Sequence, residues 1–67
     1  MYVVIELQTY DNGTVGNFVW AFTDRLEAES KYYTVMAAAA VSKLPVHACV
    51  LLDNGGERYM SGAYYHD

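Results

Sequence analysis

The residues with the most distinctive chemistry in this chain are His47 and Cys49, which lie two apart in an apolar run. On a strand, an imidazole and a thiol at that spacing share one face, as metal ligands or a nucleophile and its base would have to. Zinc needs three or four such ligands, but there is no second cysteine and the other histidine, His66, lies near the C-terminus. The two side chains would also lie about 6–7 Å apart, too far for a hydrogen bond. We therefore expect no metal site and no catalytic residue, with Cys49 as a buried thiol and His47 as a half-exposed contact residue.

Two further motifs carry less weight. Glu6 is the one carboxylate expected in the middle of a strand, and it has no obvious partner for acid–base chemistry. Gly13 and Gly16 form a GxxG sequence, which in nucleic-acid-binding modules joins two helices. Here it lies between two expected strands of an acidic chain. No cofactor is implied by any of these residues.

Composition narrows the function classes further. The 67 residues carry a net charge of −4, and the four cations are scattered, so we expect no direct contact with nucleic acid. A single cysteine allows no intramolecular disulfide, and no apolar run approaches the roughly 20 residues of a membrane span. There is also no pattern of a signal peptide, so we expect a cytoplasmic protein. Hydrophobic residues make up 54% of the chain, which suggests that association hides some apolar surface.

The stretch from Asp24 to Leu44 predicts one helix. Asp24 can cap it with Glu27 completing a capping box, and Pro45 cannot continue it. Two apolar stripes lie on roughly opposite sides: one is Leu26, Ser30, Tyr33, Ala37, Ala40 and Leu44, and the other is Ala28, Tyr32, Val35 and Ala39. We expect the first stripe to pack on a sheet and the second to face another copy. On this interpretation Tyr32→Arg would disrupt assembly with little loss of fold.

Strand patterns occupy the rest of the chain, over residues 2–10, 18–23, 46–53 and 57–65, with turn signals between the members of each pair. With a right-handed crossover, this order predicts an α+β domain spanning residues 1–67. Its fold is ββαββ, a four-stranded antiparallel sheet of order 2-1-3-4 with one helix packed on one face. We expect the wholly apolar sheet face under the helix, formed by Val3, Ile5, Leu7, Val46, Ala48, Val50 and Leu52. The mixed face should then be an open contact surface, formed by Tyr2, Val4, Glu6, Gln8, Tyr10, His47, Cys49 and Leu51.

The seven tyrosines carry the most functional weight. Tyrosine supplies a large contact area at a low cost in side-chain entropy, as protein interfaces need. The plainer alternative is that tyrosine has a high strand propensity. As a set, together with the second helical stripe, they favour an interface, and the candidate interface residues are Ala28, Tyr32, Val35, Ala39, Tyr2, Tyr10, His47, Tyr59 and Tyr65.

Two segments of the chain carry a resemblance. The opening MYVVIELQT and the run AESKYYTVMAAAAVSKLPVHACV, which begins at Ala28, are similar to a group of short uncharacterised proteins of bacterial prophages and related mobile elements. The similarity covers nearly the whole chain, but it brings no catalytic or binding motif with it. It implies only a setting, since small phage accessory proteins are commonly non-enzymatic.

These observations lead us to expect a non-enzymatic, homo-oligomeric binding module of phage or mobile-element type, in the first place a dimer. It would act through protein–protein contacts in the cytosol of the host cell, and one candidate action is inhibition of a host defence protein. The alternative is a protein that sequesters a nucleotide-like small molecule in a pocket between subunits, where tyrosines would stack on the ligand. A second alternative is a structural or assembly protein.

Overall fold

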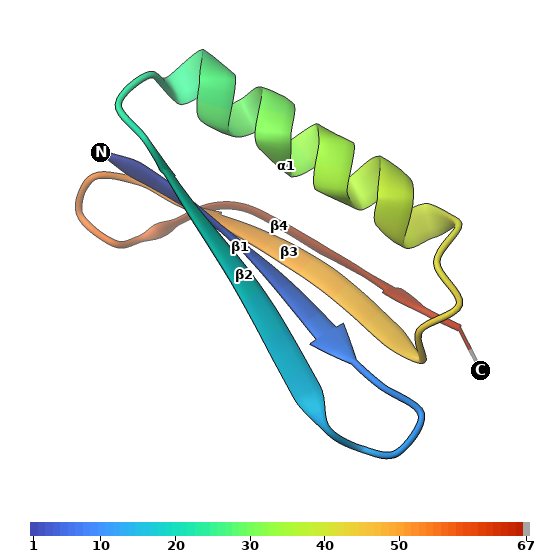
Figure 1. Ribbon diagram of the computed structural model, residues 1–67. Coiled ribbons are helices and arrows are strands. Elements are labelled where there is room, and N and C mark those ends of the chain that lie inside the picture. Colours follow the sequence, from blue (N-terminus) through green and yellow to red (C-terminus); the bar gives the residue numbers. More distant parts are fainter. Residues whose placement is uncertain (67) are drawn as a thin grey trace.

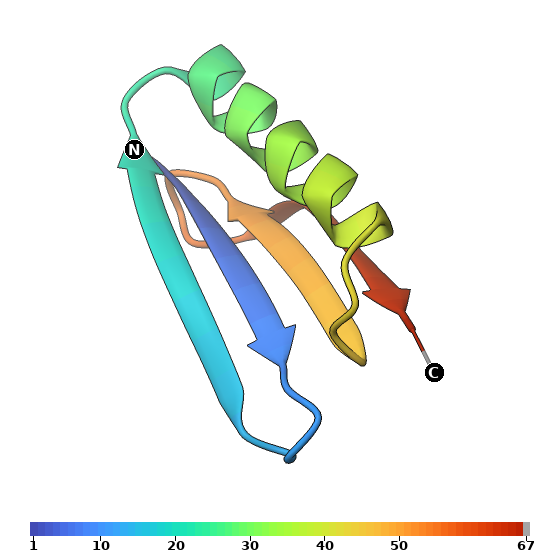
Figure 2. The same cartoon turned by 45° about the vertical axis from the view of Figure 1, so that its right-hand side comes forward.

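The computed structural model describes residues 1–66 and contains four strands and one helix. In chain order they are β1 (Tyr2–Thr9), β2 (Val15–Phe22), α1 (Arg25–Ala40), β3 (Val46–Leu52) and β4 (Arg58–Tyr65). The strands form one antiparallel sheet in the order β2-β1-β3-β4, and α1 covers one of its faces (Figures 1 and 2). The expected ββαββ order, the sheet order and the single covering helix are confirmed.

Both hairpins close with the same turn. In each, the two residues that flank a three-residue loop bond to each other through N–H and C=O at 2.8 Å, and the last loop residue is a glycine at positive φ. Gly13 has φ of 86° and Gly56 has φ of 79°. A side chain is disfavoured in that left-handed conformation. Gly56, which follows the Asn54-Gly55 turn signal, is therefore the residue that shapes the second hairpin.

The helix begins as expected but ends earlier. The Asp24 carboxylate accepts a hydrogen bond from the backbone of the first turn at 3.4 Å. The helix stops at Ala40, four residues before the expected end at Leu44. Its final carbonyls bond to nearby backbone N–H groups and to His66, whose Nε2 donates to the Ala39 carbonyl at 2.8 Å. Within residues 1–66, no helix combines the length and the apolar character that crossing a membrane would require.

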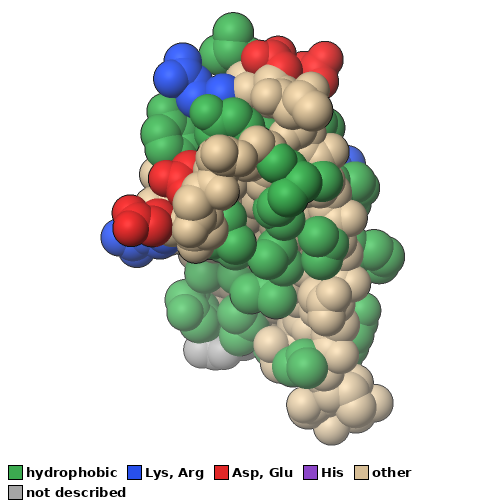
Figure 3. Space-filling view, turned by 90° about the vertical axis from the view of Figure 1, so that its left-hand side faces the viewer, with side chains coloured by type: hydrophobic (Ala, Val, Ile, Leu, Met, Phe, Trp, Pro, Cys, Tyr) green, Lys and Arg blue, Asp and Glu red, His purple; other side chains and the backbone are tan. Residues whose placement is uncertain are grey.

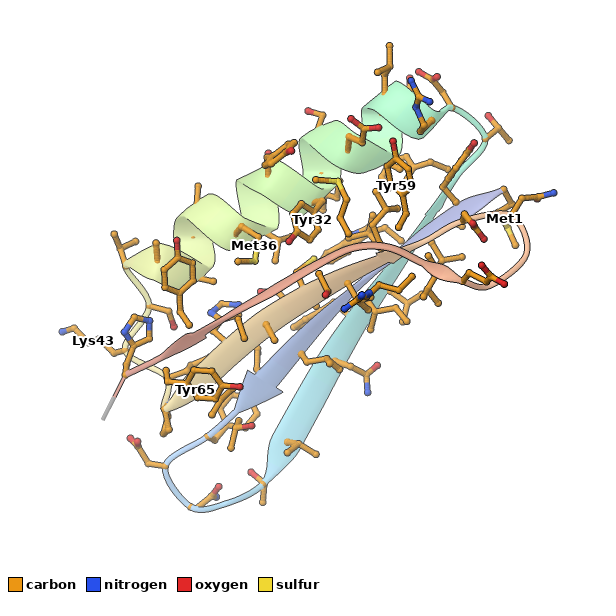
Figure 4. The ribbon with its side chains drawn as sticks, turned by 180° about the vertical axis from the view of Figure 1, so that it is seen from behind. Met1, Tyr32, Met36, Lys43, Tyr59 and Tyr65 are labelled. Atoms are coloured by element: carbon orange, nitrogen blue, oxygen red, sulfur yellow. The ribbon has the colours of Figure 1, made fainter. Side chains whose placement is uncertain are left out.

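The core lies between α1 and the sheet. Its fully buried strand residues are Val4, Cys49 and Leu51, and Tyr32 and Met36 project toward them from the helix (Figure 4). Gly62 of β4 lies directly beneath these two helical side chains, where a Cβ atom would approach the Met36 methyl group to 2.7 Å. The absence of a side chain at this position lets α1 sit close to β4.

The prediction of which helical stripe faces the sheet is wrong. The stripe expected to face a partner is buried against the sheet, and its members are Ala28, Tyr32, Val35 and Ala39. On the stripe expected to pack on the sheet, Leu26 is 63% exposed and Tyr33 is 57% exposed. Alanines at both ends of the buried stripe allow close approach, while the larger side chains between them fill the core. The ion pair of Arg25 with Glu29 (3.2 Å) lies toward solvent.

The predicted faces of the sheet are also reversed. The mixed face, which carries Val4, Glu6, Gln8, His47, Cys49 and Leu51, lies under α1, and the wholly apolar face points away from it. Polar side chains can lie under a helix when they bond to one another. Glu6, Gln8 and His47 do so, which leaves an aliphatic surface on the opposite side of the sheet.

Candidate functional site

An apolar surface lies on the sheet face turned away from α1, called here the open face. Its centre is formed by Val3, Ile5, Leu7, Val19, Val50 and Leu52, which the strand registers place side by side. Ile5 on β1 lies between Val19 of β2 and Val50 of β3. Figure 3 looks onto this side of the molecule, where hydrophobic side chains fill the middle and charged groups lie at the margins.

The open face is nearly uncharged, and at its centre exposed side chains flank half-buried Ile5 and Val50. Val19 is 58% exposed and Leu7 is 46% exposed. The four strands contain only one Asp or Glu, Glu6 under the helix, and one Lys or Arg, Arg58 at a corner of the open face. A single exposed aliphatic residue needs no explanation, but a contiguous apolar patch indicates a contact surface.

A polar network lies on the opposite side of the sheet, beneath α1. His47 Nε2 donates a hydrogen bond to Oε2 of Glu6, the Gln8 amide donates to the same oxygen at 3.1 Å, and the Tyr10 hydroxyl donates to Gln8 at 2.7 Å. His47 is 5% exposed, and its Nδ1 atom is buried with no hydrogen-bond partner among the described residues. The network holds the central strands β1 and β3 together from within the core.

The chemistry of Cys49 is suppressed by its position. The side chain is 1% exposed and lies opposite Glu6 in the register of β1 and β3. Burial, and then the nearby Glu6 carboxylate, raise the pKa of the Cys49 thiol to about 11. The thiol is therefore protonated at neutral pH, whereas a nucleophilic cysteine needs the thiolate. Among residues 1–66, no three His, Cys, Asp or Glu side chains gather closely enough to hold a metal ion.

A shallow hollow of about 370 Å³ lies beside α1 above the end of β2, lined by Phe22, Glu27, Ser30, Lys31 and Thr34. The Lys31 ammonium group lies 4.1 Å from the ring centroid of Trp20, so this cation is already engaged by an aromatic face. The carboxylate of Glu27 also lines the hollow. With one engaged cation and one carboxylate, the hollow offers no concentrated charge to a ligand.

The structure separates the predicted interface residues. Five are buried in the core, namely Ala28, Tyr32, Val35, Ala39 and His47, while Tyr2 and Tyr10 are half-buried. Tyr59 and Tyr65 are exposed, at 47% and 72%. Tyr65 lies on the open face, opposite Val46, but Tyr59 is the extra residue where the β3–β4 register shifts, and it points toward the helix side (Figure 4). Only Tyr65 of the predicted set belongs to the open face.

Of the residues at the centre of the open face, sequence reasoning assigned those of β1 and β3 (Val3, Ile5, Leu7, Val50 and Leu52) to the wrong side of the sheet. On β2 it favoured the aromatic side as the core, and Trp20 and Phe22 do pack against the core while Val19 lies outside. The available signal was the run from Ala48 to Leu52 in β3, which is apolar on both faces of the strand. Such continuous runs are typical of strands covered on both sides.

Comparison with protein-family models, with curated proteins and with solved structures gives no match to this chain.

Proposed function

We propose that this chain is a small, non-enzymatic binding module that acts through protein–protein contact, with the open face as its binding surface. The supporting observation is the uncharged aliphatic centre of that face, where half-buried Ile5 lies between exposed Val19 and half-buried Val50. Contiguous apolar surface of this kind marks interaction sites on small proteins. The setting we propose is that of a homo-oligomeric phage or mobile-element accessory protein in the host cytosol, with inhibition of a host defence protein as the candidate action of the assembled protein.

The positions of the reactive side chains support a role in binding rather than catalysis. Glu6, His47 and Cys49 lie under α1 and are turned away from the open face. A catalytic group must reach its substrate from the wall of an accessible cleft. These three side chains instead bond or pack within the core, so we assign them to stability.

Site-specific photo-crosslinking tests this proposal with a matched pair of positions. A photoreactive amino acid replaces Val19 on the open face or Tyr33 on the outer side of α1, which are 58% and 57% exposed. Crosslinking is then induced in the expressing cell. We expect a discrete, saturable protein adduct from position 19 and only diffuse background from position 33, because the two positions differ in surface chemistry and not in accessibility.

A second substitution shows whether the crosslink depends on the open face as a whole. Ile5→Lys is placed in the variant that carries the crosslinker at position 19, and we expect the discrete adduct to disappear while the far-ultraviolet circular dichroism of the fold remains. Equal crosslinking from positions 19 and 33, or an adduct unaffected by Ile5→Lys, would refute the open face as the binding surface.

The alternative function, sequestration of a nucleotide-like molecule, has one supporting observation. The hollow beside α1 combines the aromatic ring of Phe22 with the polar side chain of Ser30. A ligand held there would give the purified protein an excess of absorbance near 260 nm that is lost on denaturation and filtration. A protein-only spectrum, with no thermal shift across a panel of nucleotides, would exclude this alternative.

A further inference from the structure

We infer that the occupant of the open face is a second copy of this chain, packed face to face so that two sheets lie between two outer helices. This inference rests on the proposed function, because it names the partner of the same surface. Sheets that pack face to face commonly align within about 30° and bury the side chains between them. In this arrangement the aliphatic centre around Ile5 becomes the middle of a second core.

The area of the open face suits such a dimer. Three of the strands have eight residues and β3 has seven. Four strands about 4.8 Å apart, with a rise of about 3.3 Å per residue, give a face of roughly 500 Å² in plan. Two copies therefore contribute about 1,000 Å² of plan area, and the accessible area is larger because side chains project from the sheet. This total reaches the lower range of specific interfaces, at about 1,000–1,200 Å². A single added helix or strand would leave much of this surface exposed.

The charge distribution also permits two copies to meet. The chain carries a net charge of −4, so two copies repel each other at long range. On the strands, however, Arg58 is the one Lys, Arg, Asp or Glu on the open face, and it lies at a corner. Asp11, Asp53 and Glu57 lie at the hairpin turns, outside the centre of the open face. Glu27 and Glu29 of α1 would be separated from those of the partner by two sheet layers of about 10 Å spacing. That distance exceeds the Debye length of about 8 Å at physiological salt, so the repulsion is screened.

The composition of the open face favours a copy over a transient foreign partner. Its centre is aliphatic, and Tyr65 is the aromatic residue that the β3–β4 register places at its margin. Transient interfaces are about as polar as the remaining surface, whereas homodimer interfaces are more apolar and resemble a protein core. The run from Ala48 to Leu52 has no polar side chain on either face, as expected for a strand covered on both sides.

The test is native mass spectrometry with sedimentation velocity on the full chain and three variants. Val19→Lys and Ile5→Lys place a charge on the open face, and Tyr33→Lys places the same charge on an equally exposed position of α1. We expect the unmodified chain and Tyr33→Lys to be dimers. We expect the two open-face variants to dissociate at least tenfold more readily and to retain the circular dichroism of the fold. Val19 lies on the edge strand β2, so Val19→Lys still tests the interface if Ile5→Lys, on the central strand β1, impairs folding.

The outcomes separate this inference from the proposed function. A monomer at about 100 μM, where a dimer with a Kd of about 1 μM would be mostly associated, would overturn the inference. A dimer that both open-face variants leave unchanged would also overturn it, since the interface would then lie elsewhere. If the chain is monomeric but the crosslinker at position 19 still captures one discrete foreign protein, the inference fails and the proposed role of the open face in binding stands. A monomer without that adduct contradicts both.

Discussion

Glu6 of β1 and His47 of β3 bond to each other beneath α1, through a carboxylate oxygen and the imidazole Nε2 atom. Their side chains are 13% and 6% exposed, and the Gln8 amide donates a second hydrogen bond to the same oxygen at 3.1 Å. A buried carboxylate destabilises a protein strongly unless it has partners. Because these partners are present, the mixed face of the sheet can lie under the helix and the aliphatic face can remain outside.

The first prediction concerns this pair. His47→Leu leaves the Glu6 carboxylate without its main partner, so we expect a loss of about 3–5 kcal/mol in the free energy of unfolding. The double variant Glu6→Leu with His47→Leu removes both polar groups and should recover much of that loss. Urea unfolding followed by circular dichroism measures the full double-mutant cycle.

The ion pair of Arg25 with Glu29 supplies the control for this cycle. It lies at the surface, with the Arg25 side chain 53% exposed, so Glu29→Gln should change stability by less than about 1 kcal/mol. If the effects of the two leucine substitutions simply add, Glu6 and His47 do not act as a pair and the proposed role of the network is wrong.

The second prediction uses two adjacent tyrosines of α1. Tyr32 is 6% exposed in the core and Tyr33 is 57% exposed on the outer side. Tyr32→Arg forces a charge into the core, and we expect it to lower stability by roughly 3–5 kcal/mol, a large part of the roughly 3–10 kcal/mol expected for a chain of this size. Tyr33→Arg should cost less than about 1 kcal/mol. Equal melting temperatures for the two variants would contradict the assigned orientation of the helix.

This pair also shows how far the sequence could predict the fold. The elements and their order followed from local signals: the Asp24 cap, the glycine turns and the alternation along the strands. The rotation of α1 did not follow, because both of its stripes are apolar and no periodicity distinguishes them. The choice between them depends on packing across the whole sheet, including the space that Gly62 leaves beneath Met36, and a single sequence does not encode that contact locally.

The candidate site was missed for a related physical reason. Sequence reasoning placed the more apolar face of the sheet inside, on the principle that hydrophobic residues are buried. It did not anticipate that Glu6 and His47, 41 residues apart, would satisfy each other inside the core. With that bond in place, Ile5 and Val50 lie on the outer face of the sheet, and the contact surface changes from a mixed face to an aliphatic one.

The third prediction is a loss of stability at alkaline pH. Burial raises the pKa of Cys49 from 9.0 to about 11. Below pH 9 the thiol is protonated in both the folded and the unfolded chain, so its contribution to the free energy of unfolding is fully present. As the pH rises from about 9 to about 11, the unfolded chain loses the proton first and is stabilised. We therefore expect stability to fall by an amount on the order of 2–3 kcal/mol across this range.

The variant Cys49→Ala provides the comparison for this pH dependence. It loses packing at every pH but has no thiol to titrate, so the difference in stability between it and the unmodified chain should shrink above pH 9. Tyr32, whose pKa is raised by burial and then by Cys49, is present in both proteins, so only the part of its shift that comes from Cys49 differs between them. Parallel pH profiles, or rapid alkylation of the native thiol at pH 8, would show that Cys49 is not held in the protonated, buried state.

The fourth prediction concerns the close contact at Gly62. A Cβ atom there would lie 2.7 Å from the Met36 methyl group and 2.9 Å from the Tyr32 hydroxyl oxygen. The end of Met36 can move, but Tyr32 is packed in the core, so we expect Gly62→Ala to destabilise the protein by about 1–2 kcal/mol. Thermal unfolding measures the effect.

Gly55→Ala is the matched control for Gly62→Ala, because a Cβ at position 55 would meet only an ordinary contact of 3.5 Å with Asp53. We expect Gly55→Ala to be close to neutral. If steric contact is the cause, shortening the neighbouring side chain by Met36→Val should restore part of the stability of Gly62→Ala, even though Met36→Val alone is destabilising. If Gly62→Ala and Gly55→Ala are equally stable, or if Met36→Val adds its full cost to Gly62→Ala, the spacing between α1 and β4 does not depend on this glycine.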